Sequence, residues 1–306
     1  MKTKRNKLIC MILTIALLLS LGVPGFALAP QADEDEPAFL LLGDSIPDAF
    51  GIDNRDEACY GRIVADTDHF RYYNLGRTAQ DSEELIDFID LYSVWDNDAL
   101  EYVAVKDYIR MADIICLSIG ANDYFDSPDA RDLLIGAVLG TNDETLDAIA
   151  ENYYLNLCTI IDMIRALNPD APILMQTYYC VWYGIAARPN RGCSSHVNSM
   201  IERYDRAHPG QIHICDIAPA MEHKPENLAD DCVHPNAQGN VAIAEIILQK
   251  LYDLGLGSET TPVVNVPGED WNFFEGYGKN RFEDLCLTAL VMLVTGNGVN
   301  ILRLFR

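Results

Sequence analysis

The stretch Phe39-Leu40-Leu41-Leu42-Gly43-Asp44-Ser45-Ile46 joins a short apolar run to a glycine and two polar residues. Four consecutive apolar residues bounded by a glycine are typical of a strand buried on both faces, as in a parallel sheet. Reactive groups gather at the carboxyl ends of such strands. Ser45 therefore lies where a nucleophile is expected, at a turn where the N-terminus of a following helix is expected to help stabilise negative charge. A serine that only caps a helix is the ordinary alternative.

The pattern of a strand followed by a helix repeats along the chain. Further buried strands are expected over 70–73, 113–118, 173–176 and 212–215, and amphipathic helices over 82–92, 99–111, 144–167, 197–207 and 237–254. This alternation predicts an α/β fold of three layers, αβα, in which helices cover both faces of a five-stranded parallel sheet.

Three further polar segments lie just after an expected strand or before an expected helix. They are Asn74-Leu75-Gly76, Gly120-Ala121-Asn122-Asp123 and Asp231-Cys232-Val233-His234. An aspartate three residues before a histidine can orient the imidazole, which then takes a proton from a serine. An asparagine amide can hold a developing oxyanion. Together with Ser45, these residue types indicate ester hydrolysis by a serine nucleophile.

These four segments, in this order, resemble the SGNH hydrolases, also called GDSL-type esterases and lipases, over residues 39–252. The resemblance implies a flavodoxin-like SGNH hydrolase fold with a catalytic set of Ser45, Asp231 and His234, and it implies no cofactor and no metal. It implies an oxyanion hole formed by the Ser45 N–H, the Asn122 amide and one further backbone N–H. The family's glycine about five residues after the asparagine falls on Ala79, so Gly76 and Ala79 both stay candidates.

Two departures from the family pattern follow the nucleophile, where Pro47 and Asp48 replace the small or hydroxyl residues that are expected. An aromatic segment, 177–183, follows the fourth strand at the same edge of the sheet. Tyr178, Tyr179 and Trp182 are candidates for stacking on a sugar ring or covering an acyl chain, and ordinary packing is the alternative.

The first 29 residues have the pattern of a secretory signal peptide. A basic head precedes an uncharged run over 8–23, and small residues follow at Gly25, Ala27 and Ala29. An uncleaved anchor is the alternative. The hydrolase domain is expected over 37–256, followed by a linker over 257–270 and a tail to residue 306, for which a packed helix or a weak membrane anchor is considered.

The chain is strongly acidic, with a formal net charge of −24 at pH 7. Such a charge repels phosphate backbones and argues against a nucleic-acid partner. Nine cysteines are present, and one of them, Cys10, belongs to the expected signal peptide. The remaining eight permit disulfides in an exported chain, with Cys180–Cys193 and Cys215–Cys232 as the first pairs to test. Cys116 is expected to be a buried thiol.

The sequence therefore predicts a secreted serine esterase whose partners are small-molecule or polysaccharide esters. Acylated glycans, lysophospholipids and short acyl esters all suit the predicted chemistry, because fold does not decide substrate. The alternative is a catalytically weak, extracellular glycan-binding module on the same fold. Contact with a membrane is expected only through the leader or the tail.

Overall fold

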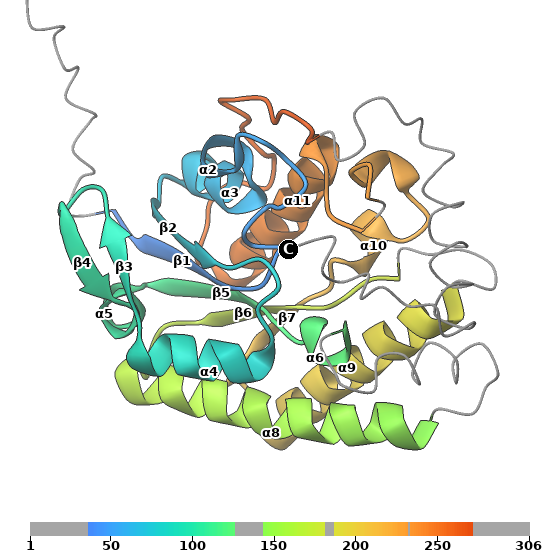
Figure 1. Cartoon of the computed structure of the whole chain (residues 1–306). Helices are drawn as coiled ribbons and strands as arrows, with labels where there is room; N and C mark the ends of the chain where they lie inside the picture. The colour runs from blue at the N-terminus through green and yellow to red at the C-terminus, as the bar shows by residue number, and fades with distance from the viewer. Residues whose placement is uncertain (1–35, 126–142, 181–186, 232, 272–306) are drawn as a thin grey trace, which may run out of the picture. The chain divides into compact units, whose positions relative to one another are not determined.

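A computed structural model of the chain describes residues 36–125, 143–180, 187–231 and 233–271. Five parallel strands form its central sheet in the order β2-β1-β5-β6-β7 (Figure 1). They are β1 (Ala38–Gly43), β2 (Arg71–Gly76), β5 (Ile114–Ser118), β6 (Ile173–Gln176) and β7 (His213–Cys215). The predicted five-stranded parallel sheet is confirmed, and the predicted strands differ from the observed ones by at most three residues at either end.

Helices lie on both faces of this sheet, as Figure 1 shows. They are α2 (Arg55–Ala58), α3 (Tyr60–Asp68), α4 (Ser82–Leu91), α5 (Val105–Met111), α6 (Asn122–Phe125), α8 (Asp143–Leu167), α9 (Ala187–Ala207), α10 (Ala218–Met221) and α11 (Ala237–Leu254), with a 3-10 turn, η1 (Pro225–Asn227). None of the helices in the described part of the chain is both long and apolar enough to span a bilayer.

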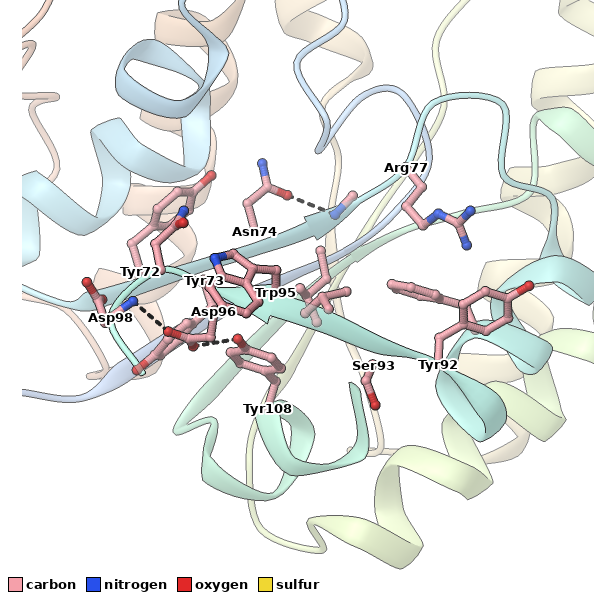
Figure 2. A pocket seen from close by; sticks show the side chains of 15 residues that line it. Tyr72, Tyr73, Asn74, Arg77, Tyr92, Ser93, Trp95, Asp96, Asp98 and Tyr108 are labelled. Carbon is pink, nitrogen blue, oxygen red and sulfur yellow. Dashed lines mark hydrogen bonds between the residues drawn. The ribbon is translucent and has the colours of Figure 1, made fainter. Parts of the chain in front are cut away.

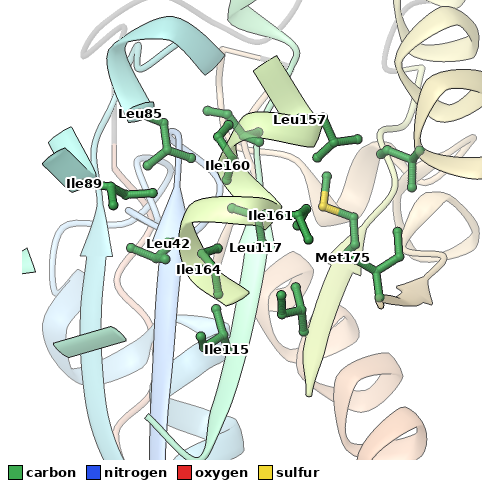
Figure 3. Packing of buried hydrophobic residues seen from close by; sticks show 14 of the residues in the cluster. Leu42, Leu85, Ile89, Ile115, Leu117, Leu157, Ile160, Ile161, Ile164 and Met175 are labelled. Atoms are coloured by element: carbon green, nitrogen blue, oxygen red, sulfur yellow. The ribbon is translucent and has the colours of Figure 1, made fainter. Parts of the chain in front are cut away.

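Side chains alternate along each strand between two separate cores. Leu42, Leu117 and Met175 pack under α4, α5, α8 and α9, as Figure 3 shows. Leu41 and Cys116 point to the other face, against α3, α10 and α11. Because successive side chains of a strand alternate between faces, an uninterrupted apolar run supplies both cores.

The order of the strands places a topological switch point between β1 and β5, where ligand sites form in open α/β sheets. Gly43 pairs with Gly76 of β2 on one side and with Ser118 of β5 on the other, so the three strands end at the same level. The loops after these strands therefore meet at one edge of the sheet.

One predicted helix is partly wrong. The segment 99–111 begins as β4 (Glu101–Ala104), which pairs with β3 (Ser93–Asp96) in an antiparallel hairpin, and only α5 is helical. The Asp96 carboxylate accepts hydrogen bonds from the N–H groups of Asp98 and Ala99 and so closes the hairpin turn. Such a side-chain turn competes with helix formation.

The segment predicted as a linker packs against the domain. The N–H of Val263 donates to Thr67 Oγ1, and the Asn265 amide donates to Asp66. At its end the Asp270 carboxylate accepts from the N–H of Ala237, and the N–H of Trp271 donates to the carbonyl of Gly51. Residues 257–271 are therefore a strap across α3 that ends beside the start of α11. The predicted signal peptide and the tail beyond 271 lie outside the described residues.

Candidate active site

Three side chains from two distant parts of the chain form a hydrogen-bonded series. The Ser45 Oγ lies 2.8 Å from Nε2 of His234, and Nδ1 of the same ring lies 2.5 Å from Oδ2 of Asp231. With the proton on Nδ1, Asp231 accepts from the imidazole and Nε2 accepts from the serine hydroxyl. This is the geometry that nucleophile activation requires.

The Asp231 carboxylate is held rigidly by its own loop. Its Oδ1 accepts from the N–H groups of Val233 and His234, at 2.9 and 3.0 Å. Burial alone would raise the pKa of this carboxyl, but the neighbouring imidazole and these hydrogen bonds outweigh burial and hold the pKa below its ordinary value. The group therefore stays ionised at neutral pH, as an acceptor for Nδ1–H must.

The residues after His234 anchor this loop. Asn236 caps α11 by accepting from the N–H of Gly239, and its amide donates to the carbonyls of Glu226 and Leu228. A side chain at Gly239 would collide with the carbonyl of Asn227, which a Cβ would approach to 2.1 Å. The sequence pattern indicated His234 but not the anchoring role of Asn236, although an asparagine directly before an expected helix is a capping signal.

Ser45 begins an irregular series of turns. The N–H groups of Asp48 and Phe50 donate to the carbonyls of Asp44 and Ser45, and no regular helix follows directly. The expectation that a helix N-terminus would support the nucleophile is therefore wrong. Gly43 adopts φ +129°, and a Cβ there would lie 1.8 Å from the carbonyl oxygen of Ser118. The close approach of β1 and β5 therefore requires glycine.

Asp44 lies buried directly beneath the nucleophile. Its carboxylate accepts from the N–H of Ile46 and from the hydroxyl of Tyr178, which also lies 3.3 Å from the Ser118 hydroxyl. Burial raises the pKa of Asp44 to about 6, and the hydrogen bonds from Tyr178 and Ile46 only partly offset that increase. Asp44 and Tyr178 thus tie the nucleophile turn to the sheet.

Asn122 lies at the start of α6, in the loop after β5. Its Nδ2 donates to the carbonyl of Gln80 at 2.9 Å, which uses one amide hydrogen; among the described residues the second has no partner and is available to a ligand. The neighbouring Asp123 accepts from the N–H and the hydroxyl of Ser82, as expected of a bracing residue. These contacts join the loop after β5 to the loop after β2.

The two candidates for the further backbone donor differ in availability. The N–H of Gly76 already donates to Oδ1 of Asn74 at 2.9 Å. The N–H of Ala79 makes no hydrogen bond within the described part of the chain, and Ala79 adopts φ +66°. This left-handed conformation favours glycine, which explains why the resemblance places a glycine there. Alanine adopts this conformation at an energetic cost. Because its N–H is available, Ala79 is the better candidate for the further backbone donor to the oxyanion.

The departures Pro47 and Asp48 connect the nucleophile turn to the loop after β2. The Pro47 carbonyl accepts from the Asn74 amide at 2.8 Å. The Asp48 carboxylate accepts from the N–H and the hydroxyl of Thr78 and forms a salt bridge with Arg55. Both residues therefore fix the position of the segment that carries Ala79.

The aromatic residues proposed to contact substrate are placed differently from expectation. Tyr178 and Tyr179 are only 7% and 6% exposed, and the Tyr179 hydroxyl donates to the carbonyl of Val233. Neither ring offers a free face, because both hydroxyls lie within the protein. Trp182 lies outside the described residues.

Two aromatic residues that the sequence did not indicate form a stack on the imidazole: Phe50 contacts the ring, and Trp271 packs behind Phe50. The Phe50 ring contacts His234 edge-on, with 4.9 Å between centroids, and Trp271 contacts Phe50 at 4.8 Å. Trp271 reaches this position through the strap, 226 residues along the chain from Ser45. Such contacts restrict rotation of the imidazole, and no local pattern in the sequence signals them.

The cysteines do not pair as expected. Cys193 and Cys215 are free thiols, so neither Cys180–Cys193 nor Cys215–Cys232 is formed. Cys215 is fully buried at the end of β7, where its side chain packs in the core under α11, and Cys116 is buried as predicted. Among the described residues, no cluster of three or more histidine, cysteine or acidic side chains is suited to hold a metal ion.

Comparisons with known proteins agree with the fold and with the motifs. The sequence matches the profile of the GDSL-like Lipase/Acylhydrolase family over residues 41–242. A search of curated proteins returned no match.

Solved structures with the same fold share little sequence. The lipase Lip_vut3 from a goat rumen metagenome is 16% identical, with a TM-score of 0.54, over 72% of this chain and 98% of its own. Phospholipase A1 from Streptomyces albidoflavus NA297 is 15% identical, with a TM-score of 0.51, over 70% and 99%. A mutant acetyl-xylooligosaccharide esterase from Geobacillus is 16% identical, with a TM-score of 0.50, over 74% and 97%.

Proposed function

Because the chain belongs to the GDSL-like lipase/acylhydrolase family, we propose that it is a serine esterase that cleaves carboxylic esters through an acyl-enzyme. The observation that carries this proposal is the hydrogen-bonded series from Ser45 through His234 to Asp231. A module that only binds glycans has no need of a serine aligned with an imidazole and a buried carboxylate, so this series favours turnover over the alternative of a weak binding module.

The first half of the reaction forms the acyl-enzyme. Ser45 Oγ attacks the ester carbonyl carbon while its proton passes to Nε2 of His234, and the carbonyl oxygen becomes an oxyanion. The second amide hydrogen of Asn122 and the N–H groups of Ser45 and Ala79 supply the donors for that oxyanion. The imidazolium then protonates the leaving alcohol, and the bond between the carbonyl carbon and the alcohol oxygen breaks.

The second half releases the acid. Water attacks the acyl group as His234 takes its proton, and the collapse of the second oxyanion returns the proton to Ser45. Asp231 stays ionised throughout and stabilises the imidazolium. The lowered pKa of the Asp231 carboxyl suits this role, because a protonated carboxyl would stabilise the cation less.

Replacement of the nucleophile tests this proposal. We expect Ser45→Ala to abolish hydrolysis of p-nitrophenyl acetate and labelling by a fluorophosphonate probe. Ser195→Ala is the matched control, because Ser195 is an exposed serine on α9 whose hydroxyl donates to the carbonyl of Gly192. Undiminished turnover by pure Ser45→Ala protein would refute the assignment.

We also propose that the protein is exported, on the strength of the signal-peptide pattern over residues 1–29. The acidic surface suits solubility outside the cell. The intact mass of the protein recovered from the medium tests this proposal: a mass that retains the first 29 residues would contradict cleavage.

A further inference from the structure

We propose that the groove between β2 and the β3–β4 hairpin binds the sugar chain of an acylated glycan whose ester is cleaved at Ser45. This inference rests on the proposed esterase function, for which it names the substrate class. The groove runs beside the active site and has no part in the hydrogen-bonded series that activates the serine.

The groove forms where the sheet ends. β2 is the outermost strand of the five-stranded sheet, and the hairpin forms a separate sheet beside it. Between them lies an open cavity of about 490 Å³, within the usual range of roughly 300–1,000 Å³ for ligand sites. Figure 2 shows aromatic and polar side chains around this space, from β2 and the hairpin and also from α5 and the end of α4, among them Tyr73, Arg77, Tyr92, Trp95, Asp98 and Tyr108.

Aromatic rings in the groove are open to solvent. Trp95 and Tyr92 are 51% and 49% exposed, which is unusual for side chains that gain so much from burial. Tyr73 and Tyr108 pack against each other with 5.2 Å between ring centroids. Exposed aromatic faces beside polar groups suit a sugar, which presents a C–H face to a ring and its hydroxyls to the side.

A cation that is held by two aromatic rings lies in the same groove. The Arg77 guanidinium is held over Phe88 and Tyr92, at 4.7 and 5.5 Å from the ring centroids. Within the described residues its side chain makes no hydrogen bond, so its five N–H donors stay available. The rings fix the orientation of these donors before a ligand arrives, which reduces the entropy lost on binding.

The opposite wall of the groove is also rigid. The Asp96 carboxylate accepts from the Tyr108 hydroxyl and from the N–H groups of Asp98 and Ala99. These bonds tie the hairpin turn to α5 and hold the segment that carries Trp95. A preorganised wall of this kind is expected of a binding site more than of a freely moving hairpin.

The groove reaches the end of β2, which lies beside the catalytic edge of the sheet. Residues 72–77 line it, which corresponds to about 16 Å of extended chain. At its end, Gly76 pairs with Gly43, and the N–H of Arg77 donates to the carbonyl of Gly43 at 2.8 Å, two residues before Ser45. A glycan that lies along β2 would therefore extend toward the turn that carries the nucleophile.

The chemistry of the lining favours a glycan over other occupants. Asp98, Asn97 and Arg77 are poor surroundings for a fatty acyl chain, which prefers apolar walls. A peptide paired with the edge of β2 would use backbone hydrogen bonds and would not depend on the face of Trp95. The aromatic faces are thus the feature that separates the glycan from a peptide.

Binding without turnover tests the inference. The Ser45→Ala protein is run in native gels that contain acetylated xylan or acetylated glucomannan, and the retardation gives the affinity. A second substitution in the Ser45→Ala protein, Trp95→Ala, is expected to weaken its binding to the glycan about tenfold or more, since a tryptophan anchor dominates such sites. Adding Tyr252→Ala is the control, because Tyr252 is a 54% exposed aromatic on α11 outside the groove.

The outcomes separate this inference from the proposed function. Unchanged retardation by the Trp95→Ala variant, or no retardation by either glycan, overturns the glycan groove. If circular dichroism shows that Trp95→Ala is misfolded, Arg77→Gln takes its place with the same expected loss. Hydrolysis of p-nitrophenyl acetate by the wild-type protein tests the esterase separately, since that small ester does not require the groove.

Discussion

The buried carboxyl of Asp44 makes the stability of this protein depend on pH in a way that one substitution should remove. Burial raises the pKa of Asp44 from 3.8 to about 6 in the folded protein. The shift corresponds to about 3 kcal/mol, at 1.36 kcal/mol per pKa unit. Because the folded state holds this proton more tightly than the unfolded state, the carboxyl lowers the free energy of unfolding as pH rises from about 4 through 6.

Asp44→Asn removes the ionisation and keeps an oxygen that can accept from the N–H of Ile46. We expect the difference in unfolding free energy, variant minus wild type, to grow by about 2 kcal/mol from pH 4.5 to pH 8. This value is the part of the roughly 3 kcal/mol that the pKa shift contributes within this pH range. Urea unfolding at several pH values measures it. Asp253→Asn, on the exposed face of α11, controls for the change in net charge.

A difference in unfolding free energy between Asp44→Asn and wild type that does not change with pH would refute this reasoning. It would mean that the hydrogen bonds from Tyr178 and Ile46 offset burial completely, so that Asp44 has the same pKa in the folded and the unfolded protein. A difference that moves in the opposite direction would mean that the nucleophile turn stabilises the charged form.

Two further substitutions test the proposed oxyanion donors. Asn122→Ala should lower kcat for p-nitrophenyl acetate by about 10²–10³, the usual loss for one oxyanion donor, with little change in KM. The control, Asn265→Ala, removes an exposed amide from the strap and should leave kcat unchanged. Equal losses of kcat in the two variants would contradict the role of Asn122. Ala79→Gly should raise the free energy of unfolding by about 0.5–1 kcal/mol, because glycine relieves a left-handed strain of roughly 1–2 kcal/mol and loses more chain entropy. Urea unfolding checks this value, and a destabilised Ala79→Gly protein would show that the alanine is not strained.

Local patterns predicted most of the sheet and the nature of the chemistry. The strands β1, β5 and β6 are short, largely apolar runs that are buried throughout, and such a run needs only its own composition to be recognised. The same reading failed at 99–111, where the Asx turn at Asp96 and the pairing of β3 with β4 override helical periodicity. It also left Tyr178 open between substrate contact and ordinary packing, because sequence does not show that its hydroxyl is held by Asp44 inside the protein.

The chain by itself determined which groups are present: a serine after the first strand, an aspartate three residues before a histidine, and an asparagine after a glycine. Only the tertiary structure decided that Ser45 and His234 meet at 2.8 Å across 189 residues, and that Trp271 returns to the same site. The physical reason is the sequence distance over which each interaction acts. Strand and turn preferences depend on a few neighbouring residues, whereas the meeting of distant loops depends on strand order, register and packing across the whole sheet.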